Sequence, residues 1–181
     1  MLISHSKKFV FIDIPGCGSE FFISQFKKYI DGEYKDISFQ NLEEIYPNLE
    51  DYLVFCVVKN PISRMVNLYN YRQNLKNRAK RWPFANFSAW IKSDSWRQGF
   101  KVSEEIKIEP IKEQYFYIDV DNMPLVIHYE NHHEVWGCIC DYLDIKSDTI
   151  SIQKDDTSFL NGLDKILIKD FFAEDFELLG Y

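Results

Sequence analysis

The sequence lacks an excess of positive charge, which proteins that bind nucleic acids or anionic membranes usually carry. It has 21 lysines and arginines against 28 aspartates and glutamates, which gives a formal net charge of −7. The composition therefore predicts neither a nucleic acid nor a membrane surface as a partner. An anionic ligand would have to be bound by a local group of basic residues.

Disulfide-type cysteine spacing and long apolar runs are also missing. The chain has four cysteines, and two of them, Cys17 and Cys56, lie in or beside apolar stretches where a free thiol packs as a small hydrophobe. The first apolar run follows two lysines and has the length of a strand, unlike a signal peptide or a membrane span. We therefore expect a reducing, cytoplasmic location and no membrane anchor.

Sequence repeats and low-complexity stretches are absent, so the number of domains is estimated from length and composition. Hydrophobic residues make up 46% of the 181 residues and aromatic residues 17%. A chain of this length can bury one good core and hardly two. We predict a single domain over residues 1–181.

Short apolar runs that resemble strands are present. Residues 9–14 and 53–58 are rich in β-branched and aromatic residues and are followed closely by proline, as is typical of strands buried on both faces. Residues 115–118 and 125–129 are expected to form further strands.

Helical patterns lie between and after these runs. Two polar residues, Asn131 and Thr157, are candidate N-caps. The expected helices cover five stretches, namely residues 19–30, 62–77, 84–93, 131–143 and 158–172. Strands that alternate with helices predict an α/β fold with a parallel sheet flanked by helices.

Two turns follow the first two expected strands, and ligands of open parallel sheets bind at the carboxyl ends of strands. The first turn contains Gly16 and Gly18 and leads into a helix. Such a turn can bind an anion through its backbone, because the first N–H groups of a helix have no acceptor within the helix. The alternative is that both glycines only let the chain turn.

The second turn, after residues 53–58, begins with Lys59 and continues into a helix that starts near Pro61. Asn67 follows on the same helix, two turns further on. A phosphate group beside Lys59 would therefore lie within reach of Asn67.

These turns resemble the two nucleotide-binding motifs of the sulfotransferases that use 3′-phosphoadenosine 5′-phosphosulfate, especially the branch related to carbohydrate-modifying enzymes. The matching stretches are "FIDIPGCGSEF" and "VVKNPISRMVNLYNY". Two later stretches, "VIHYENHHEVWGCICDYLDI" and "IKDFFAEDFELLGY", resemble the second half of that family. The resemblance thus spans nearly the whole chain.

The resemblance implies a P-loop-like sulfotransferase fold, a three-layer αβα arrangement around a central parallel sheet. It implies transfer of a sulfonate group from 3′-phosphoadenosine 5′-phosphosulfate, the co-substrate, to a hydroxyl acceptor, with carbohydrates among the candidates. Lys59 and Asn67 would hold the 3′-phosphate. The 5′-phosphosulfate would be faced by the first turn, residues Pro15, Gly16, Cys17, Gly18 and Ser19.

The first motif departs from the family at Gly16, where the family has a lysine. A lysine there is expected to stabilise the charge that develops as sulfonate leaves, and losing such a group commonly lowers the rate about a hundredfold to a thousandfold. This favours a second hypothesis, a catalytically impaired module of the same fold that binds a nucleotide or a partner.

Glu20 is a candidate general base for the acceptor hydroxyl, because some relatives use a glutamate on this helix. The alternative is a solvent-facing acid in the first turn of a helix, where the helix dipole favours negative charge.

Other sites are less well supported by the sequence. No G-x-x-x-x-G-K-[ST] motif is present, and the arginine of a cysteine phosphatase loop is replaced by Ile23. A metal site on His133 and Cys140 would need two more ligands, so no metal is expected. The basic stretch at residues 72–81 could receive an anionic acceptor, or it could be a solvated helix end.

Overall fold

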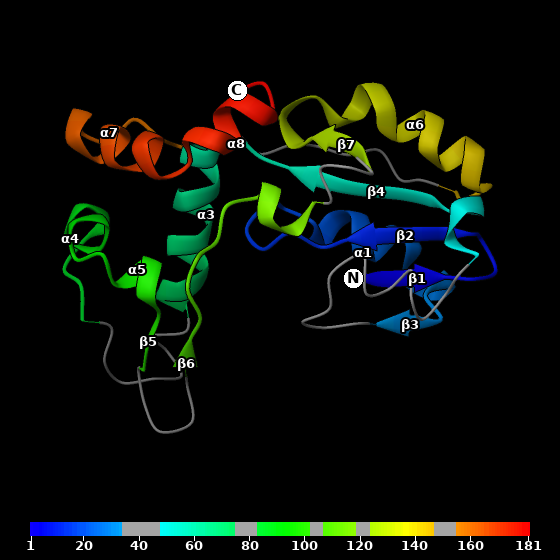
Figure 1. Cartoon of the computed structure of the whole chain (residues 1–181), viewed down its shortest axis with the longest axis horizontal. Coiled ribbons are helices and arrows are strands. Elements are labelled where there is room, and N and C mark those ends of the chain that lie inside the picture. The colour runs from blue at the N-terminus through cyan, green and yellow to red at the C-terminus, as the bar shows by residue number, and fades with distance from the viewer. Residues whose placement is uncertain (34–47, 75–82, 102–106, 119–123, 147–154) are drawn as a thin grey trace. The chain divides into compact units, whose positions relative to one another are not determined.

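A computed structural model describes residues 1–33, 48–74, 83–101, 107–118, 124–146 and 155–181 (Figure 1). The chain forms two compact units. The first unit contains Met1–Lys59 and Gln114–Lys154, and the second contains Asn60–Glu113 and Asp155–Tyr181. The expectation of a single domain over residues 1–181 stays a prediction.

The first unit is built on a five-stranded sheet with the order β3-β1-β2-β4-β7. Strands β2 and β4 are parallel, and so are β4 and β7, whereas β1 is antiparallel to both β2 and β3. The strands are β1 (Leu2–Ser4), β2 (Phe9–Ile12), β3 (Gly32–Glu33), β4 (Leu53–Val58) and β7 (Leu125–His128). An α/β fold is confirmed, but the sheet is mixed and only its β2-β4-β7 part is parallel.

The antiparallel edge has a simple cause. Residues 5–8 alone connect β1 to β2, and a parallel crossover needs about a dozen residues or more. Lys8 helps the chain to reverse with a left-handed backbone, φ 51°. The sequence prediction missed β1 because a three-residue strand is too short to show a periodic pattern.

One face of this sheet is covered by α1 (Glu20–Phe26) and α6 (His132–Leu143). The ring of Phe26 lies 5.1 Å from that of Phe9 and 5.2 Å from that of Phe11, centroid to centroid. The ring of Phe22 lies 5.0 Å from that of Trp136, so the two helices pack against each other on the same face. The third layer of the expected αβα arrangement stays a prediction.

The second unit is mainly helical. Its elements are α3 (Pro61–Asn74), α4 (Phe87–Lys92), α5 (Ser95–Gln98), the antiparallel pair β5 (Phe100–Lys101) and β6 (Lys107–Ile108), α7 (Gly162–Phe171) and α8 (Ala173–Leu178). Met65, Trp90, Trp96, Ile168 and Phe172 belong to its core, and each is fully buried.

Most of the predicted helices and strands are confirmed, with changed ends. The strand expected at residues 115–118 is wrong, since Tyr115–Tyr117 form the 3-10 helix η4, closed by the bond from Tyr117 N to Gln114 O at 3.0 Å. The N-cap expected at Thr157 is also wrong. Helix α7 is capped by Asn161, whose side chain accepts from Asp164 N at 2.9 Å. Asn131 stands at the N-cap of α6 but makes no side-chain capping bond.

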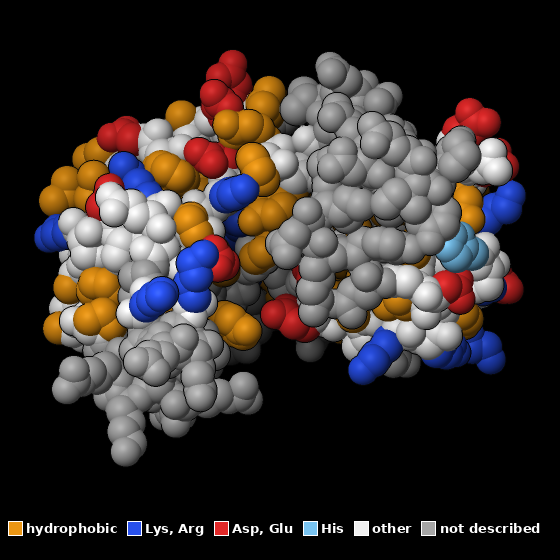
Figure 2. Space-filling view, turned by 60° about the horizontal axis from the view of Figure 1, so that its bottom comes forward, with side chains coloured by type: hydrophobic (Ala, Val, Ile, Leu, Met, Phe, Trp, Pro, Cys, Tyr) orange, Lys and Arg blue, Asp and Glu red, His pale blue; other side chains and the backbone are white. Residues whose placement is uncertain are grey.

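The surface carries charges of both signs. On the face shown in Figure 2, basic and acidic side chains are interspersed with hydrophobic ones. Of the basic stretch, Arg72 is buried and donates to Glu109 O at 2.7 Å, while Lys76, Arg78, Lys80 and Arg81 lie outside the described residues. Among the helices described, none has both the length and the apolar character required to cross a membrane.

Candidate functional site

The turn after β2 has a backbone that glycine favours. Gly16 has φ 84° and Gly18 has φ 77°, both in the left-handed region that other residues rarely adopt. The turn is closed by a bond from Cys17 N to Ile14 O at 3.2 Å. It leads into α1, as the sequence predicted.

Gly18 has a second reason to be glycine, since the ring of Tyr129 packs directly against it. A β-carbon at Gly18 would lie 2.9 Å from Tyr129 Cδ2 and closer still to Cε2. Tyr129 begins η5 (Tyr129–Asn131), directly after β7. The turn after β2 and the residue after β7 are therefore in contact at the carboxyl ends of parallel strands.

Two predicted site residues near the turn after β2, Ser19 and Glu20, bring negative charge close to it. The hydroxyl of Ser19 is buried and donates to the carboxylate of Asp13. Glu20 is exposed at the first position of α1, and Pro15 is exposed before the glycines. The exposed position of Glu20 is compatible with both alternatives, a general base and a solvent-facing acid.

Lys59, directly after β4, is buried to 3% exposure. Its ammonium nitrogen lies 4.2 Å from the centroid of the Tyr129 ring, a cation–π contact. Buried lysines are rare because desolvation of the charge is costly, so a lysine kept at a strand end calls for compensating contacts. The ring of Tyr129 is one of them.

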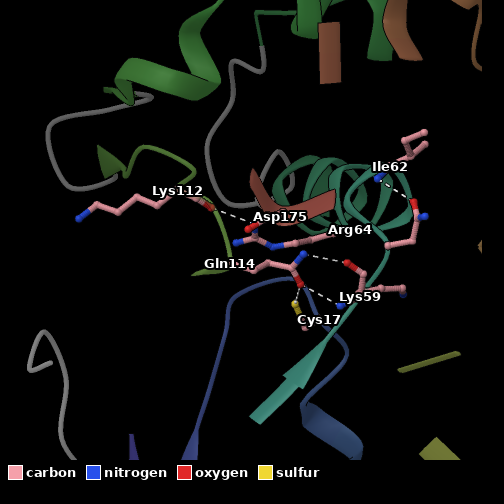
Figure 3. A network of polar contacts seen from close by, with 8 residues as sticks. Cys17, Lys59, Ile62, Arg64, Lys112, Gln114 and Asp175 are labelled. Atoms are coloured by element: carbon pink, nitrogen blue, oxygen red, sulfur yellow. Dashed lines mark hydrogen bonds and ion pairs between the residues drawn. The ribbon is translucent and has the colours of Figure 1, made fainter. Parts of the chain in front are cut away.

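The side chain of Gln114 joins the first turn to Lys59 (Figure 3). Its Oε1 accepts from Lys59 N at 2.8 Å, and its Nε2 donates to Lys59 O at 2.9 Å. The same Oε1 accepts from the thiol of Cys17 at 3.0 Å. Gln114 is fully buried, so these contacts fix both turns relative to each other within the first unit.

Tyr129 is in turn held by His132 in the first turn of α6. His132 is buried to 1% exposure, and its Nδ1 lies 2.8 Å from Tyr129 O. A carbonyl oxygen only accepts, so Nδ1 carries the ring proton. Among the described residues, Nε2 has no hydrogen-bond partner. The contact fixes the start of η5, and with it the residue that packs on Gly18 and Lys59.

Neither Gln114 nor Tyr129 was recognised from the sequence as a site residue. Both lie far along the chain from the turns they contact, and neither belongs to a motif that predicts the contact. Tyr129 could have been suspected, because it is the last residue of the strand expected at residues 125–129 and therefore lies at the same sheet edge as the two turns. Gln114 carries no such signal.

Asn67 lies half-buried on α3, in the second unit. The other predicted residues, Pro15, Gly16, Cys17, Gly18, Ser19, Glu20 and Lys59, belong to the first unit. A shared phosphate contact of Lys59 and Asn67 stays a prediction.

The buried thiols are suited to packing. Burial raises the pKa of Cys56 well above its usual range, and the nearby Cys17 raises it further. The thiol of Cys17 is itself buried and donates a hydrogen bond to Gln114 Oε1, unlike a thiolate nucleophile. Among the described residues, no three histidine, cysteine, aspartate or glutamate side chains are grouped closely enough to hold a metal ion.

The candidate site lies at the carboxyl ends of β2, β4 and β7, where Gly18, Lys59, Gln114 and Tyr129 are in contact. Gly16 and Lys59 suit an anion, since a glycine lets a ligand approach the backbone and Lys59 carries a positive charge, whereas the Tyr129 ring already packs on Gly18. Ser19 and Glu20 suit an anion less, because the Ser19 hydroxyl already donates a hydrogen bond to the Asp13 carboxylate and Glu20 is itself an acid. Comparisons with protein-family models, with curated proteins and with solved structures found no match to this chain.

Proposed function

We propose that this chain is a sulfotransferase, which moves a sulfonate group from 3′-phosphoadenosine 5′-phosphosulfate to a hydroxyl group of an acceptor such as a carbohydrate. One observation carries the proposal. The glycine turn after β2 and the buried Lys59 after β4 lie at the carboxyl ends of neighbouring parallel strands, and Gln114 bonds to both. Parallel sheets bind nucleotides at such edges.

In this proposal different residues of the site bind different groups of the donor. The backbone of the turn around Gly16 and Gly18 faces the 5′-phosphosulfate, and Lys59 provides the positive charge for the 3′-phosphate. Lysine gives a single charged contact, without the two-pronged contact that an arginine would make.

The transfer is an in-line displacement. The acceptor oxygen bonds to sulfur while the bond from sulfur to the bridging phosphate oxygen breaks, and 3′-phosphoadenosine 5′-phosphate leaves. The proton of the acceptor hydroxyl has to go to a base, and Glu20 is the candidate because its carboxylate is exposed at the start of α1.

A second function is favoured by the backbone of Gly16. Its φ of 84° would strain a lysine at this position, so the turn has a shape that does not suit the lysine of the sulfotransferase family. A module of the same fold that binds the nucleotide, or a protein partner, with little or no catalysis would need only the anion site. The two functions share the donor site and differ in turnover.

The first test is calorimetric titration with 3′-phosphoadenosine 5′-phosphate, the stable product of the donor. We expect binding by the wild type and at least about tenfold weaker binding by Lys59→Met, because the methionine keeps the apolar stem and removes the charge. Lys27→Met, an exposed lysine of the same unit, is the matched control and should bind as the wild type does.

A wild type that does not bind this nucleotide would overturn both the sulfotransferase and the nucleotide-binding module, and would leave only a module that binds a protein partner. If the Lys59→Met variant binds the nucleotide as tightly as the wild type, the nucleotide must bind at another site. Where binding holds, a sulfonate-transfer assay with the intact donor and a set of alcohols and sugars separates the functions. Turnover above the uncatalysed rate supports the enzyme, and binding without turnover supports the module.

A further inference from the structure

The second unit contains a pocket, and none of the residues that line it is assigned to the donor. Its volume is about 440 Å³, and its walls come from the first turn of α3, from Thr157 and from α7. Pockets of this size hold small organic molecules. The charge and polarity of the side chains that line it determine which ligand it can bind.

Two lysines give this pocket its charge. Lys165 and Lys169 both line it, and a spacing of four residues places them on neighbouring turns of one face of α7. Over the part of the chain that the structure describes, neither forms an ion pair with an acidic side chain. The Lys169 ammonium has a weaker contact, at 5.9 Å from the centroid of the Phe176 ring. Two like charges so placed repel each other, and an anion between them removes that repulsion.

The remaining walls offer hydroxyl groups and apolar surface. Ser63 and Thr157 bring one hydroxyl each from separate segments, while Ile62 and Ile166 are apolar. The described residues that line the pocket include no acid. Asp156 directly precedes Thr157 in the sequence, and its carboxylate already accepts from Ser158 N at 2.9 Å and from Ser158 Oγ at 2.6 Å.

We propose that this pocket is a second ligand site, for a small phosphate or sulfate monoester that carries an apolar organic group. The two ammonium groups and the two hydroxyls bind the tetrahedral oxyanion, and the isoleucines contact the organic group. The volume exceeds what a bare phosphate ion fills, which favours an ester over the free ion. This proposal does not depend on the proposed sulfotransferase activity, because its residues are different.

The test is a titration of the isotope-labelled whole chain, followed by amide NMR spectra. The probes are phenyl phosphate, phenyl sulfate and inorganic phosphate, with sodium chloride at matched ionic strength. We expect saturable shifts at Ser63, Thr157 and Lys165, with both phenyl esters binding more tightly than inorganic phosphate. The double variant Lys165→Gln/Lys169→Gln should bind at least about tenfold more weakly.

A matched double variant, Lys92→Gln/Lys101→Gln, loses the same charge from exposed positions of the same unit and should bind within about twofold of the wild type. The spectra themselves report whether each variant is folded. Shifts that sodium chloride reproduces, or binding that the first double variant keeps, would overturn the proposal. So would shifts confined to Gly16, Gly18 and Lys59, which would instead assign the esters to the donor site.

Discussion

The side-chain amide of Gln114 pairs with both backbone groups of Lys59, 55 residues earlier in the chain. The bonds are 2.8 Å and 2.9 Å long, and both residues are buried. The amide of Gln114 accepts from the Lys59 N–H and donates to the Lys59 C=O, as the backbone of a neighbouring strand would do. These two bonds thus hold the backbone just beyond the end of β4 in place.

Replacing Gln114 by alanine should therefore be costly. The change removes the acceptor of Lys59 N and Cys17 Sγ and the donor to Lys59 O. We expect the free energy of unfolding in urea to fall by about 2 to 4 kcal/mol, since buried polar groups lose their partners. Hydrogen exchange at the Lys59 amide should accelerate as well.

Gln98→Ala is the control for that variant, because Gln98 is an exposed glutamine at the end of α5. Its effect should stay within about 0.5 kcal/mol. Equal effects of the two substitutions would mean that the Gln114 bonds contribute nothing to stability.

Two glycine-to-alanine substitutions should have opposite signs. Gly18→Ala places a β-carbon against the Tyr129 ring on a backbone with φ 77°, and we expect it to destabilise the fold by about 1 to 3 kcal/mol. Gly137 lies within α6, and a β-carbon there meets nothing within 4 Å. Gly137→Ala should stabilise the fold by about 0.5 to 1 kcal/mol, because alanine favours helices. Thermal unfolding of both variants measures the two effects, and a Gly18→Ala variant as stable as the wild type would contradict the close packing.

A buried ion pair in the second unit predicts a large loss on substitution. Arg64 Nη1 lies 4.0 Å from Asp175 Oδ2, with side-chain exposures of 1% and 0%, and it also donates to Lys112 O at 2.9 Å (Figure 3). Asp175→Asn keeps the shape and removes the negative charge, so the buried guanidinium loses its counter-charge. We expect a loss of about 3 kcal/mol in unfolding free energy.

The exposed pair of Lys107 and Glu109 provides the comparison. Its atoms are closer, at 3.0 Å, but both side chains are more than half exposed, at 64% and 67%. Glu109→Gln should cost less than about 1 kcal/mol, since water and salt screen the pair. If Asp175→Asn were as mild, the carboxylate would not be compensating Arg64.

Native cysteine labelling should be selective. Cys138 is exposed on α6, whereas Cys17, Cys56 and Cys140 are buried. Iodoacetamide should label one thiol rapidly in the folded protein and the others roughly a hundredfold or more slowly, as local opening exposes them. Cys138→Ser removes the rapid phase. Rapid labelling of Cys17 in that variant would indicate a reactive thiol in the first turn and would contradict its bond to Gln114.

The raised pKa of Cys56 predicts a loss of stability in alkaline solution. A thiol in the unfolded chain ionises near pH 8.5, while burial keeps Cys56 protonated in the folded protein to higher pH. Its contribution is fully present below about pH 8.5 and is lost as the pH rises further, by about 1.4 kcal/mol per pH unit. The difference in unfolding free energy between wild type and Cys56→Ala should therefore shrink between pH 8 and pH 10. A difference that does not change with pH would show that Cys56 ionises alike in both states.

The central strands and their turns could be predicted from the sequence because they depend on local patterns. Residues 53–58 form β4 as expected, since an uninterrupted apolar run before Asn60 and Pro61 has few alternatives to a buried strand. Helix α6 buries His132, Trp136, Ile139, Cys140 and Leu143, which follow the helical period. The strand predicted at residues 115–118 was wrong, because an apolar run of four residues fits a strand and a 3-10 turn equally well. The sulfotransferase resemblance is still a prediction.

Local sequence patterns were sufficient to predict the α/β class, the strands β2, β4 and β7, and the turns that follow β2 and β4. These follow from hydrophobic period and from the backbone preferences of glycine and proline, which act over a few residues. The contacts of Gln114 and Tyr129 with those turns, and the antiparallel edge of the sheet, came from the three-dimensional packing and could not be predicted. Such contacts join residues far apart in the chain, and they depend on which surfaces remain to be buried once the local elements have formed.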